Sequence, residues 1–262
     1  MASTSIVRAR FRKGFRRSAA RLRRRARSFL GQYPSVYLPF ARWKRRRYLR
    51  TALEQGIVPE AKAPVDRDTD AVIEGFPRSA NTFAATAFAL AQPNSVRVAR
   101  HLHVPSQVIF AAKRGIPTMV LIRPPEDAVA SLIVRAPILT PKEGLKEYVR
   151  FYRRILPHRR RFVVATFDEV STDFGQSIRR LNERFGTSFW EFDHTSEAVA
   201  RCFKIMEEHE RDRSGDVVER RVARPSKQRE PLKDSLRTQM RSRELARLRS
   251  EAYQLYGALT SS

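Results

Sequence analysis

The sequence is short of cysteine, of long apolar runs and, over its first fifty residues, of acidic side chains. One cysteine, Cys202, among 262 residues excludes an internal disulfide framework and suits a reducing compartment. Free cysteines are usually buried, so we expect Cys202 in the core of a helix rather than as a reactive thiol. No stretch approaches the ~20 apolar residues that span a bilayer, and arginines interrupt the N-terminus too often for a signal-peptide core. We therefore expect a cytoplasmic protein, with peripheral attachment to the inner face of a membrane left open.

The missing acids leave residues 1–50 strongly basic. They hold 17 of the 52 Lys and Arg and none of the 27 Asp and Glu, so most of the net charge of +25 belongs to them. Such a field attracts anionic lipid headgroups, acidic glycans or nucleic acid. Aromatic and aliphatic residues alternate with the arginines, which suits helices lying on an anionic membrane or on an acidic partner; a solvated basic tail fits equally. Gly31, Pro34 and Pro39 are expected to break the segment into two short helices.

The remaining chain is predicted to form one α/β domain, because strands and helices alternate from Ala71 onward. We predict a basic arm over 1–58, a Pro- and Asp-containing linker over 59–70, and the domain over 71–262. Four strands are expected, at 71–74, 95–100, 118–122 and 162–166. Helices are expected at 81–90, 105–113, 125–134, 142–156, 172–185, 196–210 and 241–255. This order predicts a parallel sheet covered by helices on both faces.

The segment Gly75–Phe83, GFPRSANTF, follows the first strand and leads into a helix. Helix N-termini bind phosphate readily, because their first N–H groups lack partners and the dipole is positive there. Gly75 permits tight turning, and Arg78 supplies a fixed cation. Ser79, Asn81 and Thr82 supply further donors. A capped helix bearing a surface arginine is the alternative interpretation of this segment.

The same segment is not a Walker A loop. That loop requires a Gly-Lys pair followed by Ser or Thr, whose hydroxyl holds Mg²⁺, and the sequence here has neither. A nucleotide remains a plausible ligand, whereas a triphosphate bound with Mg²⁺ is disfavoured. No closely spaced His, Cys, Asp and Glu residues suggest any other metal site.

A second candidate is LIRPPEDAVAS, residues 121–131. Arg123 closes a buried strand at the edge where α/β folds bind ligands, and Ser131 lies eight residues later on the next helix. An arginine and a serine that converge there can share a phosphate.

The histidines of RHLHVP, His101 and His103, are the candidate general bases, since an imidazole accepts a proton near neutral pH. Placed two residues apart, they would face the same side of a strand. Surface histidines in a basic turn are the alternative, and the residues alone do not choose between the two.

Together, GFPRSANTF and RPPEDAVAS, in this order and about 45 residues apart, resemble the sulfotransferases that use 3′-phosphoadenosine 5′-phosphosulfate (PAPS), over roughly residues 71–233. The resemblance implies a P-loop-like nucleotide-binding fold with PAPS as co-substrate and no metal ion. It implies a 5′-phosphosulfate loop that includes Arg78, in place of the family's usual lysine. The other residues of that loop would be Gly75, Pro77, Ser79, Ala80, Asn81, Thr82 and Phe83.

The resemblance also assigns the remaining roles. Arg123 and Ser131 would hold the 3′-phosphate, Phe167 would meet the adenine unless it is a plain core aromatic, and His103 would be the catalytic base beside Arg78. A late basic loop is matched by Arg224, Ser226 and Lys227, although the family's glycine is absent there.

These expectations add up to an enzyme that moves a sulfuryl group from PAPS to a hydroxyl, or an amine, of an acceptor such as a glycan, a glycolipid or a small metabolite. Three alternatives stay open: a P-loop kinase-like enzyme, a basic nucleic-acid- or membrane-binding protein, and an inactive domain of the same type. The arm would meet an anionic membrane surface or an acidic glycan, whereas nucleic acid is not expected as its partner. Nothing in the sequence identifies the acceptor or the oligomeric state.

Overall fold

A computed structural model describes residues 18–54, 62–214 and 226–261 of the protein. Its centre is a four-stranded sheet in the order β2-β1-β3-β4, with every neighbouring pair parallel. The strands are β1 (Ala71–Gly75), β2 (Val98–Arg100), β3 (Thr118–Ile122) and β4 (Val163–Thr166). Before the sheet come a helix over residues 18–30 and α2 (Pro34–Glu54). The later helices are α3 (Asn81–Ala91), α4 (Pro105–Arg114), α5 (Pro125–Arg135), α6 (Pro141–Ile155), α7 (Phe167–Thr172), α8 (Phe174–Phe185), α9 (Ser196–Ser214), α10 (Glu230–Met240) and α11 (Ala246–Thr260), with short 3₁₀ turns at η1 (Leu156–Arg161), η2 (Lys227–Arg229) and η3 (Arg243–Leu245).

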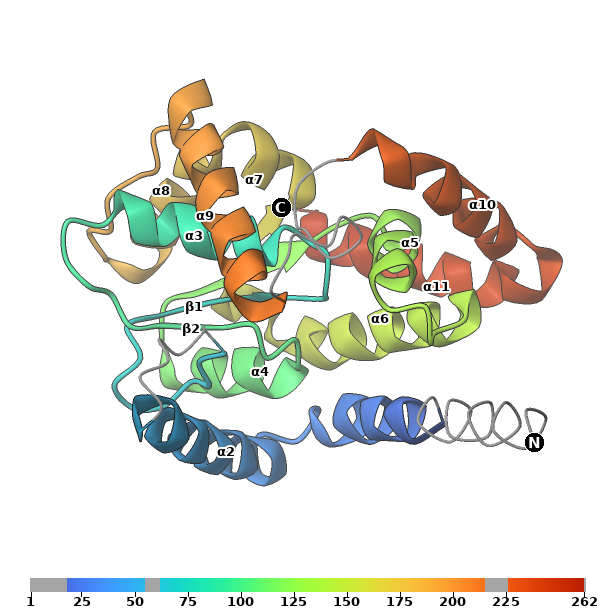
Figure 1. The fold of residues 1–262 in the computed structure, drawn as a ribbon, viewed down its shortest axis with the longest axis horizontal. Coiled ribbons are helices and arrows are strands. Elements are labelled where there is room, and N and C mark those ends of the chain that lie inside the picture. The colour runs from blue at the N-terminus through green and yellow to red at the C-terminus, as the bar shows by residue number, and fades with distance from the viewer. Residues whose placement is uncertain (1–17, 55–61, 215–225, 262) are drawn as a thin grey trace, which may run out of the picture.

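The sheet is buried on both faces, as the sequence predicts. Alternate residues of a strand point to opposite faces. Met119 and Leu121 pack with α3, α8 and α9, whereas Val120 and Ile122 pack with α5, α6 and α11. Figure 1 shows these two helical layers on either side of the strands. The run TMVLI forms a central strand in which every residue is buried, as is usual for a parallel sheet covered on both faces.

The connections open a crevice at the carboxyl ends of β1 and β3. The chain leaves β1 through α3 toward β2, then crosses back through α4 to β3 on the other side of β1. As a result, α3 and α5 cover opposite faces of the sheet. In open α/β sheets, ligands bind where the chain direction switches in this way.

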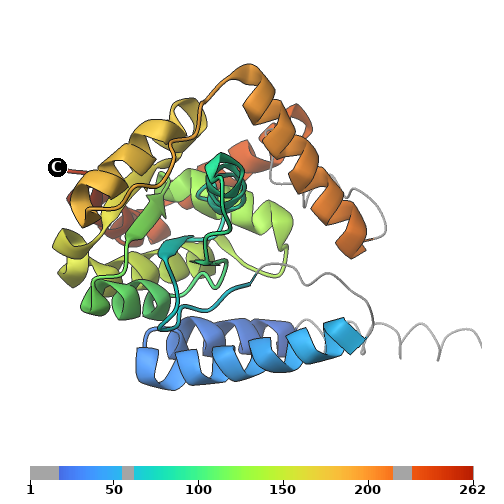
Figure 2. The ribbon, with the colours of Figure 1, turned by 90° about the vertical axis from the view of Figure 1, so that its left-hand side faces the viewer.

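The N-terminal helices pack on the edge of this domain. Leu38 and Ala41 of α2 are buried in an apolar cluster with residues of β1, β2 and α4. The Arg42 guanidinium donates to the Val65 carbonyl and lies 4.7 Å from the centre of the Phe110 ring. Figure 2 shows both helices side by side along one flank of the molecule.

The expected break at Pro39 is wrong. The two helices separate at residues 31–33, and Pro39 lies inside α2. A proline there removes the hydrogen bond to the carbonyl four residues earlier, and its ring crowds that carbonyl. That carbonyl belongs to Ser35, an exposed residue, so water can replace the lost donor.

Other boundaries also differ from the sequence prediction. The strand expected at 95–100 begins only at Val98, as β2. The helix expected at 172–185 begins two residues later, as α8, because the Asp173 side chain caps it by accepting from the Gln176 N–H. The short helix α7, which ends just before it, was not expected. The last helix, expected at 241–255, is displaced to Ala246–Thr260, and α10 precedes it. No helix in the described residues has the length and apolar character needed to cross a bilayer.

Candidate active site

The loop between β1 and α3 exposes the start of a helix to the crevice. Ala80, the N-cap of α3, has no side chain able to cap, and no side-chain cap hydrogen bond is made. The first N–H groups of an α-helix have no partner within it. Arg78 and Ala80 both have positive φ, 75° and 63°, and left-handed residues alternating with others turn successive N–H groups inward as an anion-binding nest. The loop therefore has the local geometry of a phosphate or sulfate site.

Gly75 has a different role from the turning expected of it. Its φ is not positive, but a Cβ at this position would lie 2.3 Å from the carbonyl oxygen of Leu121. Glycine is required because β1 and β3 approach closely at the place where the loop begins.

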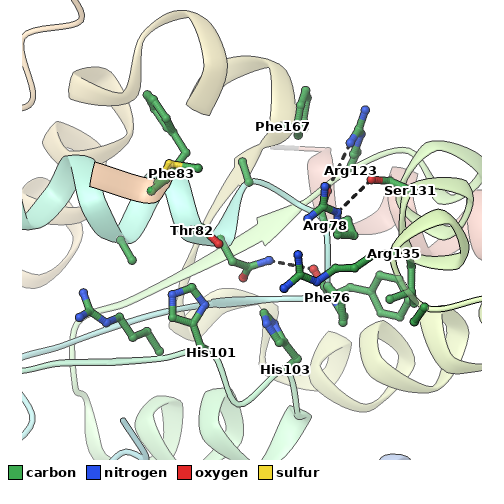
Figure 3. Close-up of a pocket in the computed structure, with 18 of the residues that line it drawn as sticks. Phe76, Arg78, Thr82, Phe83, His101, His103, Arg123, Ser131, Arg135 and Phe167 are labelled. Atoms are coloured by element: carbon green, nitrogen blue, oxygen red, sulfur yellow. Dashed lines mark hydrogen bonds between the residues drawn. The ribbon is translucent and has the colours of Figure 1, made fainter. Parts of the chain in front are cut away.

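Arg78, Arg123 and Ser131 meet at the carboxyl ends of β1 and β3, although they are far apart in sequence. The Arg78 Nε donates to the Ser131 hydroxyl at 3.0 Å. The Arg123 Nη1 donates to the Arg78 carbonyl at 3.4 Å. Figure 3 shows the two guanidinium groups and the hydroxyl gathered on one side of the cavity.

This cluster is strongly electropositive. Burial, together with the nearby charges of Arg135, Arg229 and Arg123, lowers the pKa of Arg78 to about 9. Burial also lowers the pKa of Arg123, although the carboxylate of Asp127 opposes the change. Desolvation and like charge both disfavour a cation, so a bound anion would stabilise the charged form of these arginines.

His103 lies opposite, braced by a buried carboxylate. Its Nδ1 is 3.0 Å from the Gly75 carbonyl oxygen and 3.2 Å from the Glu74 Oε1. Both neighbours only accept hydrogen bonds, so Nδ1 carries the hydrogen and the neutral ring keeps its lone pair on Nε2. This is the tautomer that a general base at Nε2 requires.

Glu74 is itself held firmly. It is fully buried and accepts from the Gly75 and Leu102 N–H groups and from the Gln107 side chain. Buried carboxylates are stable only when several donors satisfy them. Sequence reasoning missed Glu74, although an acidic residue ending an otherwise apolar strand, AVIEG, was a usable signal.

The strand geometry expected for the two histidines is wrong, although they do lie on the same side. β2 ends at Arg100, and His101 and His103 both have positive φ, 62° and 49°. Their ring centres are 5.8 Å apart. Left-handed backbone at non-glycine residues costs about 1–3 kcal/mol each and is concentrated at functional sites.

These groups border one cavity of about 780 Å³, a size that suits a nucleotide-sized ligand. Most of the predicted residues line it: Pro77, Arg78, Ala80, Asn81, Thr82, Phe83, His101, His103, Arg123, Ser131 and Phe167. Among the predicted residues that the structure describes, Gly75, Ser79, Ser226 and Lys227 are not part of its wall. Arg224 lies outside the described residues.

The two predicted aromatic contacts have different surroundings. Phe167 begins α7, and the Arg123 guanidinium lies 3.9 Å from the centre of its ring. Phe83 is mostly buried and packs against Phe192 and Phe203. Phe167 is thus tied to the arginine cluster, whereas Phe83 joins the cavity wall to the core.

Other cavity residues went unnoticed in the sequence because they come from distant elements. Arg135 ends α5 and extends toward the histidines in Figure 3. Arg229, in η2, is the basic residue that the late segment brings to the wall, in place of Lys227. Arg24 and Arg27, from the helix over residues 18–30, complete one side.

Tyr152 holds the start of the loop between β1 and α3 in place. Its hydroxyl donates to the Leu121 carbonyl at 2.8 Å and accepts from the Phe76 N–H at 3.3 Å. Burial raises the pKa of Tyr152, so the hydroxyl stays protonated and keeps both bonds. It thereby joins the end of β3 to the start of the loop.

Within the described ranges, no group of three or more His, Cys, Asp and Glu side chains could hold a metal ion. The site combines a cationic anion-binding side with an imidazole whose Nε2 can accept a proton. That combination can transfer a charged group to a hydroxyl or an amine.

Comparisons with known proteins give little beyond this. No protein-family model matches the chain, and no curated protein sequence matches it. Among solved structures, the chain is similar to mouse sulfotransferase SULT7A1 complexed with PAP, with 14% identity and a TM-score of 0.39, covering 73% of this chain and 90% of that one.

Proposed function

We propose that this chain is a sulfotransferase that moves a sulfuryl group from PAPS to a hydroxyl, or an amine, of an acceptor. The observation that carries the proposal is the convergence of Arg78, Arg123 and Ser131 at a capless helix N-terminus, opposite a histidine braced by Glu74. One part of this arrangement suits an anion with more than one phosphate, and the other part suits proton abstraction.

The donor set fits the two phosphorylated ends of PAPS. The N–H groups at the start of α3 and the Arg78 guanidinium would hold the 5′-phosphosulfate, since both favour oxyanions. Arg123 and Ser131 would hold the 3′-phosphate. Phe167, stacked on Arg123, offers a flat apolar face that suits an adenine. PAPS supplies a sulfuryl group on a good leaving group, the 5′-phosphate.

The residues of the chain then supply positioning and proton transfer. His103 Nε2 would take the acceptor proton as the acceptor oxygen bonds to sulfur and the bond from sulfur to the 5′-phosphate oxygen breaks. Arg78 and the loop N–H groups would stabilise the charge that grows on the departing phosphate. Glu74 would stabilise the imidazolium that forms, as a buried carboxylate does in other histidine-based sites.

Arg123 gives the direct test of the donor site. Calorimetry with 3′-phosphoadenosine 5′-phosphate (PAP), in the absence of Mg²⁺, should show binding to the wild type. Arg123→Ala should weaken it by roughly 10- to 100-fold, because a hydrogen bond to a charged group contributes about 1.5–3 kcal/mol. Arg243→Ala, a change at an exposed arginine of η3 outside the cavity wall, should have no effect.

Two results would count against the proposal. Unchanged PAP affinity in Arg123→Ala would remove the 3′-phosphate site. Tight Mg²⁺-dependent ATP binding, with no response to PAP, would instead favour the kinase-like alternative.

A further inference from the structure

Exposed apolar side chains gather on the N-terminal helices. Eight of the eleven large hydrophobic residues exposed in the described part of the chain lie between Leu22 and Tyr48. Five of them form what we call the outer stripe, each 40–56% exposed: Phe29, Tyr33, Val36, Phe40 and Trp43. Monomeric soluble proteins seldom leave such a group uncovered without a partner for it.

Three of the five residues of the outer stripe lie on one face of α2. With a turn of about 100° per residue, Val36, Phe40 and Trp43 fall within about 60° of one another. Leu38 and Ala41, which are buried against the domain, fall on the opposite side. Phe40 and Trp43 stack, with ring centres 6.0 Å apart. The helix therefore has two apolar faces, of which only one is used by the fold.

Cations surround the outer stripe, and acids are absent from it. Residues 18–53 include no Asp or Glu. Lys44, Arg46, Arg47 and Arg50 are exposed on the same helix, and the Arg47 guanidinium lies 5.8 Å from the Trp43 ring centre. Aromatic and aliphatic residues ringed by basic ones are the composition of helices that lie in the interface of an anionic bilayer.

We propose that the outer stripe docks on an anionic lipid bilayer. Tryptophan and tyrosine favour the headgroup level, where the ring is partly apolar and its polar end stays wet. The flanking cations pair with anionic headgroups. A second copy of the chain is a poorer occupant, because its identical cationic face would repel this one.

The helices that carry the stripe are fixed to the domain, so docking would orient the whole molecule. The Arg24 guanidinium forms two parallel bonds with the Glu147 carboxylate, at 2.9 and 2.7 Å. Arg150 donates to the Ser28 hydroxyl at 2.7 Å, and the Gly31 carbonyl accepts from the Ser106 N–H at 2.9 Å.

Docking would also bring the cavity close to the lipid. Arg24, Arg27 and Ser28 line the cavity, while Phe29, on the same helix, belongs to the outer stripe. A helix is about 10 Å across, so one helix diameter would separate the cavity wall from the headgroups.

Vesicle co-sedimentation of the full chain tests the proposal. The wild type should sediment with vesicles of phosphatidylcholine and phosphatidylserine at 7:3, and should stay in solution with phosphatidylcholine alone. Phe40→Ser with Trp43→Ser should weaken binding at least tenfold. Trp190→Ser is the matched control, since Trp190 is another exposed tryptophan, 63% exposed and outside these helices, and it should bind as the wild type does.

A second pair of variants tests the charges. Lys44→Gln with Arg46→Gln should weaken binding several-fold, whereas Arg243→Gln with Arg247→Gln, at two exposed arginines elsewhere, should not. Thermal melting, with and without PAP, shows whether each variant is folded and keeps its donor site, so this test does not depend on the proposed activity.

The proposal would be overturned by any of three results. The wild type could fail to sediment with the anionic vesicles. The Phe40 and Trp43 variant could bind like the wild type, which would mean adsorption by charge alone. Light scattering could show that the wild type is a dimer and that the Phe40 and Trp43 variant is a monomer, which would make the outer stripe a contact between two copies of the chain.

Discussion

At the scale of single residues, Glu74 gives the candidate base its chemical form. Its carboxylate lies beside His103 Nδ1, and Gln107 donates to the other carboxylate oxygen at 2.9 Å. The Glu74 carboxylate thus has two neighbours: the buried side-chain amide of Gln107 and the His103 ring at the edge of the cavity. The two contacts can be separated by mutation.

We expect His103→Ala to abolish sulfuryl transfer while PAP affinity stays nearly unchanged. Glu74→Gln should lower turnover by about 10²-fold, within the range that general base catalysis contributes. It should also lower stability by about 1–3 kcal/mol, because an amide N–H₂ would face the donors that Glu74 now accepts. An activity assay with the acceptor measures the change in turnover, and urea unfolding measures the change in stability.

The double change Glu74→Gln with Gln107→Glu is the control, because it keeps a buried carboxylate–amide pair but moves the charge away from His103. Stability should recover only in part, because the Gly75 and Leu102 N–H groups still point at residue 74, and turnover should not recover. Recovery of both would mean that Glu74 has a structural role only.

At the scale of elements, the junction of β1 and β3 leaves no room for a side chain at Gly75. A Cβ would lie 2.3 Å from the Leu121 carbonyl oxygen, in the part of the sheet where the loop and Arg123 begin. The strands would have to separate there, and the cavity would widen.

Gly75→Ala should therefore destabilise the protein by about 1–3 kcal/mol, the usual cost of overpacking, and should weaken PAP binding. Gly257→Ala is the comparison, since a Cβ there meets nothing within 4 Å inside α11. It should stabilise the protein by about 0.5–1 kcal/mol, because alanine favours a helix interior. Denaturant unfolding would refute this account if the two variants changed stability equally.

At the scale of the whole molecule, charge opposes the folded state. The net charge is +25, and burial together with the nearby charges of Arg135, Arg229 and Arg123 lowers the pKa of Arg78. Self-repulsion of this kind weakens as salt shortens the range of charge interactions.

We expect the melting temperature to rise by about 2–4 °C, equivalent to roughly 1 kcal/mol, when NaCl increases from about 0.05 to 0.3 M. PAP at 100 times its Kd should raise it by about 5–10 °C, since binding at that ratio contributes about 2.7 kcal/mol. A neutral solute at the same osmolality is the control. A melting temperature that fell with NaCl would show that favourable ion pairs, such as Arg24 with Glu147, outweigh the repulsion.

Local patterns predicted the sheet well. The short apolar runs AVI, TMVLI and FVVAT favour buried strands, and the helices between them favour parallel pairing, because a crossover returns the chain in the same direction. The meeting of Arg78 with Arg123 was predictable for the same reason, since the carboxyl ends of neighbouring parallel strands share one edge. The role of His103 in catalysis stays a prediction.

What the sequence by itself determined, then, is the order of the four strands along the chain and the edge of the sheet where a ligand is expected, because these follow from periodicity and chain direction. The tertiary structure alone decided that Glu74 braces His103 and that Arg135, Arg229 and Arg27 join the cavity. It alone decided which face of α2 is exposed and which packs against the domain. Those contacts depend on left-handed backbone at non-glycine residues and on packing between segments more than seventy residues apart, such as Arg27 and Leu102, and no local pattern specifies either one.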